Sequence, residues 1–201
     1  SALMQGLADG YFVLPYTVQN YLADQINVPR FSTDLPEFVE AEKTVKSKLE
    51  GFLKNKGSKS VDSFHKRLGH IMWDNVGMAR NKAGLEKAIV EIKALREEFW
   101  KEVEVPGSME GMNVELEKAT RVADFLELGE LMARDGLHRE ESSGGHFREE
   151  YQTPEGEALR NDKDFMYVAS WEYNGDKEPI LNKESLDYEE IEVKTRNYKE
   201  A

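Results

Sequence analysis

Successive stretches of this sequence repeat apolar residues every three or four positions, and this period constrains the fold more than any other feature. The first run opens between Ser32 and Pro36, where an acceptor side chain and a proline suit a helix start, and it stops near Gly57. Its apolar face is formed by Phe38, Ala41, Val45, Leu49, Phe52 and Leu53. Because helical spacing puts these residues on one side, the run predicts an amphipathic helix.

Three further runs follow with the same period. One opens at Ser60, the next carries apolar residues from Leu85 to Phe99 and ends at Pro106–Gly107, and the last begins at Asn113. Short linkers between helices of this length favour antiparallel neighbours. The pattern predicts a mostly α fold, an antiparallel bundle of three main helices with an additional N-terminal helix.

The N-terminal stretch is apolar almost from its first residue. Apolar side chains recur from Leu3 to Leu14 and continue to a break at Asn27–Arg30, and Pro15 is expected to kink the helix or to end its first part. A helix that starts without a cap or a preceding turn indicates a piece of something longer. An ordinary N-terminal helix left after processing is the alternative.

The composition changes near Asp135–Gly136, where glycines, acid pairs and alternating aromatic residues replace the helical period. Residues 165–173 alternate as a strand does, and Asn174–Gly175 marks a turn. Residues 179–181 suggest a short edge strand and residues 188–198 a last one. A small sheet of this kind is marginally stable alone, so we expect it to pack on the bundle or on a partner.

Charge and composition exclude several kinds of chemistry. The chain has 39 acidic and 27 basic residues, so a net charge of −12 argues against a nucleic-acid partner. It has no cysteine, which excludes disulfides, thiolate nucleophiles and cysteine metal ligands within these residues. Its four histidines lack metal-ligand spacing, and no metal site is expected: His65, His70, His138 and His146.

The stretch from Arg139 to Arg148 is the densest polar constellation in the sequence. Its two glycines allow close approach of a ligand or another chain, and exposed amides there can hold an anion. No Gly-x-Ser-x-Gly elbow accompanies its serines and histidine, so catalysis is not indicated. A plain loop and a docking loop both remain open. The candidate docking residues are Ser142, Ser143, Gly144, Gly145, His146 and Arg148.

Three stretches, in this order, resemble the flavoprotein subunits of succinate dehydrogenase and fumarate reductase, in a Bacteroides-like bacterial form. Residues 1–12 resemble the helix after the family's Gly-Ala-Asn-Arg-Leu-Gly turn, and residues 70–80 resemble its second bundle helix. Residues 141–160 resemble its late Glu-Ser-x-Gly-x-His-x-Arg loop. The resemblance implies three parts: residues 1–30 as the last helix of the FAD-binding domain, 31–136 as the helical bundle, and 137–201 as a C-terminal loop and small β subdomain.

The resemblance also implies a function. The chain is then the C-terminal part of a subunit that interconverts succinate and fumarate, with FAD reached through backbone amides at Ala2 and Leu3. The catalytic residues lie upstream, so none is expected here, and this part alone is expected to be inactive and not to hold FAD. The implied partners are the upstream FAD-binding and capping domains, an iron–sulfur subunit and, through the complex, a quinone-binding membrane anchor. The implied location is the cytoplasmic face of the inner membrane.

Two departures and two alternatives accompany this resemblance. Many family members carry arginine or cysteine where Ser143 stands and alanine where Gly145 stands. Our hypothesis is that the loop packs against the flavin domain or the iron–sulfur subunit.

The alternatives to this family assignment are a related flavoprotein, either an aspartate oxidase or an adenylylsulfate reductase, and a stand-alone helical interaction domain with an acidic surface.

Overall fold

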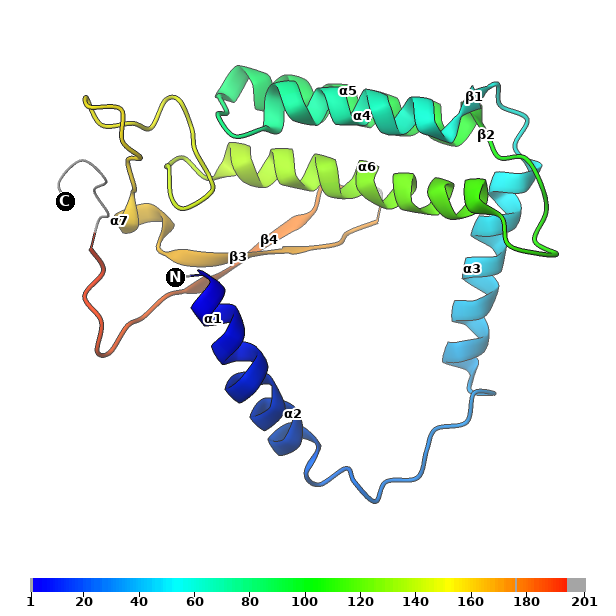
Figure 1. Ribbon diagram of the computed structural model, residues 1–201, viewed down its shortest axis with the longest axis horizontal. Coiled ribbons are helices and arrows are strands. Elements are labelled where there is room, and N and C mark those ends of the chain that lie inside the picture. Colours follow the sequence, from blue (N-terminus) through cyan, green and yellow to red (C-terminus); the bar gives the residue numbers. More distant parts are fainter. Residues whose placement is uncertain (1, 176, 195–201) are drawn as a thin grey trace. The chain divides into compact units, whose positions relative to one another are not determined.

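The structure is a computed structural model that describes residues 2–175 and 177–194 (Figure 1). It divides into two compact units, Ser1–Ser47 and Lys48–Ala201. The first unit contains one continuous helix and the beginning of another: α1 (Ala2–Ala8), the π-helical turn η1 (Asp9–Val13), α2 (Leu14–Leu22) and the start of α3 (Pro36–Lys54). The three-part division of the chain at residues 30 and 136 remains a prediction.

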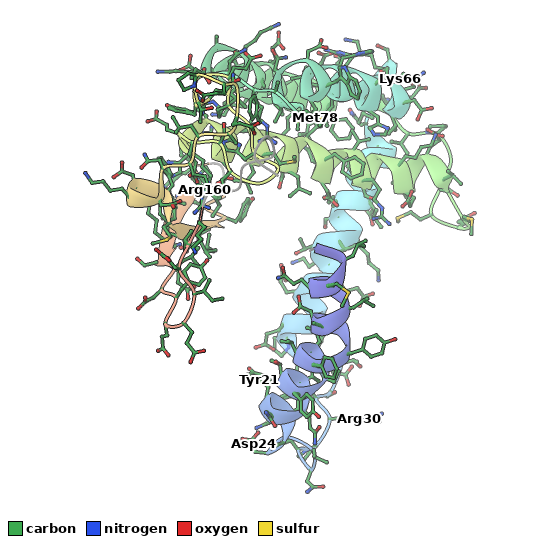
Figure 2. The ribbon with its side chains drawn as sticks, turned by 60° about the vertical axis from the view of Figure 1, so that its left-hand side comes forward. Tyr21, Asp24, Arg30, Lys66, Met78 and Arg160 are labelled. Carbon is green, nitrogen blue, oxygen red and sulfur yellow. The ribbon has the colours of Figure 1, made fainter. Side chains whose placement is uncertain are left out.

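The N-terminal helix continues through Pro15, with its distortion placed one turn earlier. The N–H of Leu14 donates to the carbonyl of Asp9, five residues back, as in a π-helix. Because proline has no N–H and its ring crowds the carbonyl of Tyr11, this wider turn accommodates it. The apolar side chains of this helix are exposed, and Figure 2 shows them projecting from the ribbon, Tyr21 among them.

The second unit is built around three helices, α4 (Val61–Val76), α5 (Lys82–Glu102) and α6 (Val114–His138), which lie side by side in Figure 1. Each begins at a side-chain cap, provided by Ser60, Asn81 and Asn113 in turn. Apolar residues from all three helices form one continuous core. The predicted antiparallel bundle is confirmed, as are the helix starts at Ser60 and Asn113.

Helix α3 joins this core only through its last turn. Phe52 is buried there, and Leu49 and Leu53 pack against the same cluster. Phe38 and Val45, which the sequence pattern puts on the same face, are exposed. One apolar face along the whole helix was predicted, and within the second unit its C-terminal end packs against the bundle.

Helix α5 ends at Glu102, before the predicted end at Pro106–Gly107. The two following residues, β2 (Val103–Glu104), pair in parallel with β1 (Lys59–Ser60). Val103 is fully buried beside the core. Because these two residues pair with β1 and Val103 is buried, the helix ends before the proline. The sequence pattern did not predict this earlier end.

The C-terminal region forms a small antiparallel sheet after the short helix α7 (Asp162–Phe165). Strand β3 (Tyr167–Glu172) pairs with β4 (Ile180–Ser185) along its whole length. The predicted alternation is confirmed within β3, since Tyr167 is buried and Val168 is exposed, but the predicted bounds of 165–173 are too wide. Phe165 ends α7, and Tyr173 lies beyond the strand and is exposed. The indole N–H of Trp171 donates to Oδ1 of Asp135 in α6, at 2.8 Å. The sheet therefore packs on the bundle, as expected.

The last predicted strand is wrong where the structure describes it. Residues 188–194 contain no strand, and residues 195–198 lie outside the described residues. Ile191, which was expected to alternate with acidic neighbours on a sheet, is 69% exposed. An alternating pattern forms a strand only where a neighbouring strand supplies hydrogen bonds and a face to bury. None of the described strands pairs with residues 188–194.

An ion-pair cluster ties β1 and α4 to α5. Arg67 donates two hydrogen bonds of 2.7 Å to the two carboxylate oxygens of Glu98, and Lys59 lies 2.5 Å from Oε1. Hydrogen bonds lower the pKa of Glu98 from 4.5 to about 2, and the bond from Arg67 has a larger effect than the bond from Lys59. The folded state therefore favours the ionised carboxylate.

Replacing Glu98 with glutamine is expected to lower the free energy of unfolding by about 1 kcal/mol at pH 7, because solvent screens this partly exposed group. Since the folded pKa is depressed, the contribution is fully present above about pH 5 and is lost as the pH falls toward 2. Urea unfolding of both proteins at pH 7 and at pH 2.5 measures the loss of free energy of unfolding at each pH. The exposed neighbour Glu97, changed to glutamine, is the control, and an equal loss at the two pH values would contradict the assignment.

Candidate functional site

The candidate loop begins directly after α6 and is closed by a tight hairpin. Ser143 and His146 exchange two backbone hydrogen bonds, of 2.8 and 3.0 Å, with Gly144 and Gly145 at the tip. Gly144 has φ +57°, a conformation that favours glycine. A Cβ added at Gly145 would meet nothing within 4 Å, so the alanine common in the family fits here. The tip is exposed, and a Cβ added at either glycine would meet none of the described residues within 4 Å.

Ser142 and Arg148 fasten the base of this loop to the end of α6. The hydroxyl of Ser142 accepts from the backbone N–H of Arg148 at 2.8 Å and donates to its carbonyl at 3.2 Å. The Arg148 side chain is 1% exposed; its Nη1 donates to the carbonyls of Gly136 (2.8 Å) and Leu137 (3.2 Å), and its Nε to Glu150 (3.0 Å). Both candidate residues thus make contacts within the chain, including two helix-end carbonyls that α6 leaves without partners.

A second arginine joins the loop to the β sheet. Nη1 of Arg139 donates to Glu141 (2.9 Å) and to the carbonyl of Phe165 (3.1 Å), and its guanidinium lies 5.2 Å from the ring centre of Tyr167. Glu141 is buried, and its other oxygen accepts the N–H of Asn161 at 2.8 Å. The loop, the sheet and the end of α6 are therefore joined by buried, charge-assisted hydrogen bonds.

His146 lies between the loop and the segment that joins α4 to α5. Its Nε2 donates to the carbonyl of Arg139 at 2.9 Å, and its Nδ1 lies 3.2 Å from Nη1 of Arg80. Burial lowers the pKa of His146 below its usual 6.5; the Arg139 carbonyl opposes this, and the charges of Arg80 and Arg148 add to the lowering. The neutral ring, with the proton on Nε2, can accept the hydrogen bond from Arg80.

Arg80 is a site residue that sequence reasoning missed. Its backbone N–H donates to the carbonyl of Phe147 (3.1 Å), and its carbonyl accepts a hydrogen bond from the backbone N–H of Glu149 (2.8 Å). Arg80 closes one of the stretches that resemble the family, but no pattern in the sequence links it to a loop more than sixty residues later. Only the folded chain brings the two segments together.

Ala2 and Leu3 belong to the first unit, in the first turn of α1. Amides in the first turn of a helix have no acceptor within the helix and can donate to another group. Leu3 is 84% exposed, and no acidic residue stands in this turn. These features fit the edge of a flat, electron-rich ring such as a flavin, although they provide only a small part of the contacts that FAD needs.

No group of three or more histidine, aspartate or glutamate residues among the described residues is arranged to hold a metal ion. In the part of the chain that the structure describes, no helix has the length and apolar character needed to cross a membrane.

Comparison with known proteins agrees with the resemblance. A family model described as the fumarate reductase flavoprotein C-terminus matches residues 65–198. The fumarate reductase flavoprotein subunit of Helicobacter pylori is 30% identical over 141 residues, which are 70% of this chain and 19% of that protein. An uncharacterized FAD-dependent oxidoreductase of Methanocaldococcus jannaschii is 29% identical over 113 residues, which are 56% of this chain and 20% of that protein.

A solved structure shares the fold. Sdh1 of Mycobacterium smegmatis, solved in complex with UQ1, has a TM-score of 0.68 and 20% identity, covering 83% of this chain and 27% of that chain. The family match, together with this shared fold, defines the chain as the C-terminal region of a flavoprotein oxidoreductase subunit. The chain belongs to the fumarate reductase flavoprotein C-terminal family, and it spans about a fifth of the length of the relatives it matches.

Proposed function

We propose that this chain is the C-terminal part of a flavoprotein subunit that interconverts succinate and fumarate and passes electrons to an iron–sulfur subunit and a quinone. The single observation that carries the proposal is the family match over residues 65–198. In that subunit FAD supplies the hydride acceptor or donor. The residues described here position and dock, and we assign none of them a catalytic role.

The N-terminal helix supports a contact with the flavin. In the proposal, the backbone amides of Ala2 and Leu3 donate to the edge of the flavin ring, where the positive end of the helix favours electron-rich atoms. The exposed apolar surface that follows, from Leu3 to Leu14, then packs against the upstream FAD-binding domain. Two backbone amides supply only a small part of the contacts that FAD needs, and the family's catalytic residues lie upstream. This part alone is therefore expected neither to hold FAD nor to turn over substrate.

The loop after α6 supports a docking role. Its base is fixed by Ser142 and Arg148, while its tip, Gly144–Gly145, is exposed and open. A rigid base beneath an exposed tip suits a surface that another domain or subunit contacts. The proposed partners are the upstream FAD-binding and capping domains and the iron–sulfur subunit, with a membrane anchor reached only through the complex, at the cytoplasmic face.

Expressing the full-length protein that contains this chain tests the proposal. We expect flavin fluorescence on the band after acid precipitation and electrophoresis, together with succinate-dependent dye reduction, while residues 1–201 alone show neither. Oxidation of aspartate without covalent flavin would move the protein to the aspartate oxidase branch. Absence of flavin in any form would leave a helical interaction domain.

A further inference from the structure

The turn between β3 and β4 contains the one Asn-Gly pair of the sequence, Asn174–Gly175. Asn174 is half-buried, and Gly175 is exposed with φ +62°, a left-handed conformation that glycine adopts without strain. Apart from the two neighbours in the chain, a Cβ added at Gly175 would meet none of the described residues within 4 Å. The backbone nitrogen that follows Asn174 therefore stands in an open turn, with no side chain of its own to shield it.

This backbone nitrogen is also free to react. Within residues 2–175 and 177–194, the N–H of Gly175 donates no hydrogen bond. The carboxamide of Asn174 is held at its nitrogen, where Nδ2 donates to the carbonyl of Glu178 at 3.2 Å. Its Cγ is an electrophilic carbon, and the bonds between Cγ and the Gly175 nitrogen are few enough for the two atoms to close a five-membered ring. A free nucleophile and its electrophile thus belong to the same pair of residues.

Asn113, at the start of α6, lacks this freedom. Its Nδ2 donates to the carbonyl of Pro106 at 2.9 Å, and its Oδ1 accepts from the N–H of Leu116 at 3.1 Å. The next residue is Val114, whose branched Cβ crowds the nitrogen that would have to attack. A carboxamide held at both ends beside a shielded nitrogen cannot readily close the same ring.

We propose that Asn174 is a site of spontaneous modification, at which the carboxamide becomes a carboxylate through a cyclic imide formed with Gly175. The nitrogen of Gly175 loses its proton to a base and bonds to Cγ of Asn174, and the side-chain nitrogen leaves as ammonia. Water then opens the ring at either of its carbonyl carbons. The net change is uptake of water and release of ammonia, with no oxidation or reduction, and the products are aspartate and isoaspartate.

The modification would change how the turn is closed. A carboxylate has no N–H, so the hydrogen bond from position 174 to the carbonyl of Glu178 is lost. Isoaspartate also carries the main chain through the side-chain carbon, which lengthens the turn. The side chain of Glu178 pairs with Lys93 of α5 at 2.9 Å and with Arg134 of α6. The altered turn is therefore the one that these ion pairs hold against the bundle.

Peptide mapping of the full-length protein, kept folded at pH 8 and at pH 6, tests the proposal. Trypsin releases residues 164–177, in which Asn174 has the only amide side chain, and residues 102–118, in which Asn113 has the only one. We expect residues 164–177 to gain the mass of an amide-to-acid exchange, faster at pH 8 because base removes the proton, and to contain both aspartate and isoaspartate. Residues 102–118 are the matched control and should stay unchanged.

No mass gain in residues 164–177, or an equal gain in the two peptides, would overturn the proposal. Aspartate without isoaspartate would overturn it as well, since direct hydrolysis of the carboxamide needs no nitrogen from Gly175. Digestion at mildly acidic pH, with a sample that was not incubated alongside, excludes conversion during preparation. The Asn174→Gln variant should show no gain, because its longer side chain cannot close the five-membered ring, and a gain there would also contradict the assignment.

Discussion

Replacing Arg148 with methionine is expected to lower the free energy of unfolding of this chain by about 3 kcal/mol. Methionine keeps much of the side-chain volume but removes every donor. The carbonyls of Gly136 and Leu137 and the carboxylate of Glu150 then lose hydrogen bonds of 2.8, 3.2 and 3.0 Å. Unsatisfied acceptors at a buried helix end cost more than the hydrogen bonds themselves contribute. Urea denaturation followed by circular dichroism measures the loss.

Arg160→Met is the matched control for this substitution. Arg160 also pairs with a carboxylate, Asp162, but that carboxylate is largely exposed and the pair is close to the surface. We expect a loss of less than about 1 kcal/mol there. Equal losses in the two variants would mean that burial of Arg148 adds nothing, and the structural role given to it would be wrong.

The burial of Arg148 also changes how a docking experiment on the loop must be designed. Truncating this residue releases the end of α6 and the base of the loop, so a failure of assembly would report unfolding as readily as a lost contact. Gly145 is better suited, because a Cβ added there would meet none of the described residues within 4 Å and its φ is not positive. A bulky residue at Gly145 that leaves stability unchanged but weakens assembly would report docking.

Local features of the sequence predicted most of the second unit. Apolar residues at helical spacing, together with capping residues at Ser60 and Asn113, determined where α4 and α6 begin, because both signals act within one turn. The alternation over residues 165–173 predicted β3 in the same way, with bounds slightly wider than those of the strand. These elements need only short-range information, which the sequence contains.

The parts that sequence reasoning missed depend on contacts between distant segments. Arg80 meets His146 and Trp171 meets Asp135 only after folding, and neither pair has a spacing that marks it. The helical period of α3 does not say how far its apolar face is covered, since coverage depends on which segment packs there. The loop residues were chosen as a dense polar group, and their division into a buried base and an open tip needed the structure.

Replacing Phe99 with alanine is expected to lower the free energy of unfolding by about 3–5 kcal/mol. Phe99 is fully buried at the centre of an aromatic cluster, with ring centres 5.3 Å from Phe64, 5.8 Å from Phe52 and 5.4 Å from Trp100. The loss has two parts. One is the free energy gained by burying the phenyl ring away from water, and the other is the cost of the cavity that the three large neighbours cannot close. Phe38→Ala is the control, since its ring is exposed and should cost about 0.5 kcal/mol or less.

The same cluster tests how α3 is attached to the bundle. Phe52 is the buried residue of α3, and it meets α5 through Phe99 and through a stacked contact with Trp100 at 5.0 Å. If the last turn of α3 folds together with the bundle, the double variant of Phe52 and Phe99 loses less than the sum of the single losses, by about 0.5–3 kcal/mol. Purely additive losses would mean that Phe52 and Phe99 contribute to stability without an interaction energy between them. In that case the aromatic contacts would contribute to packing in the folded state without coupling the last turn of α3 to the bundle.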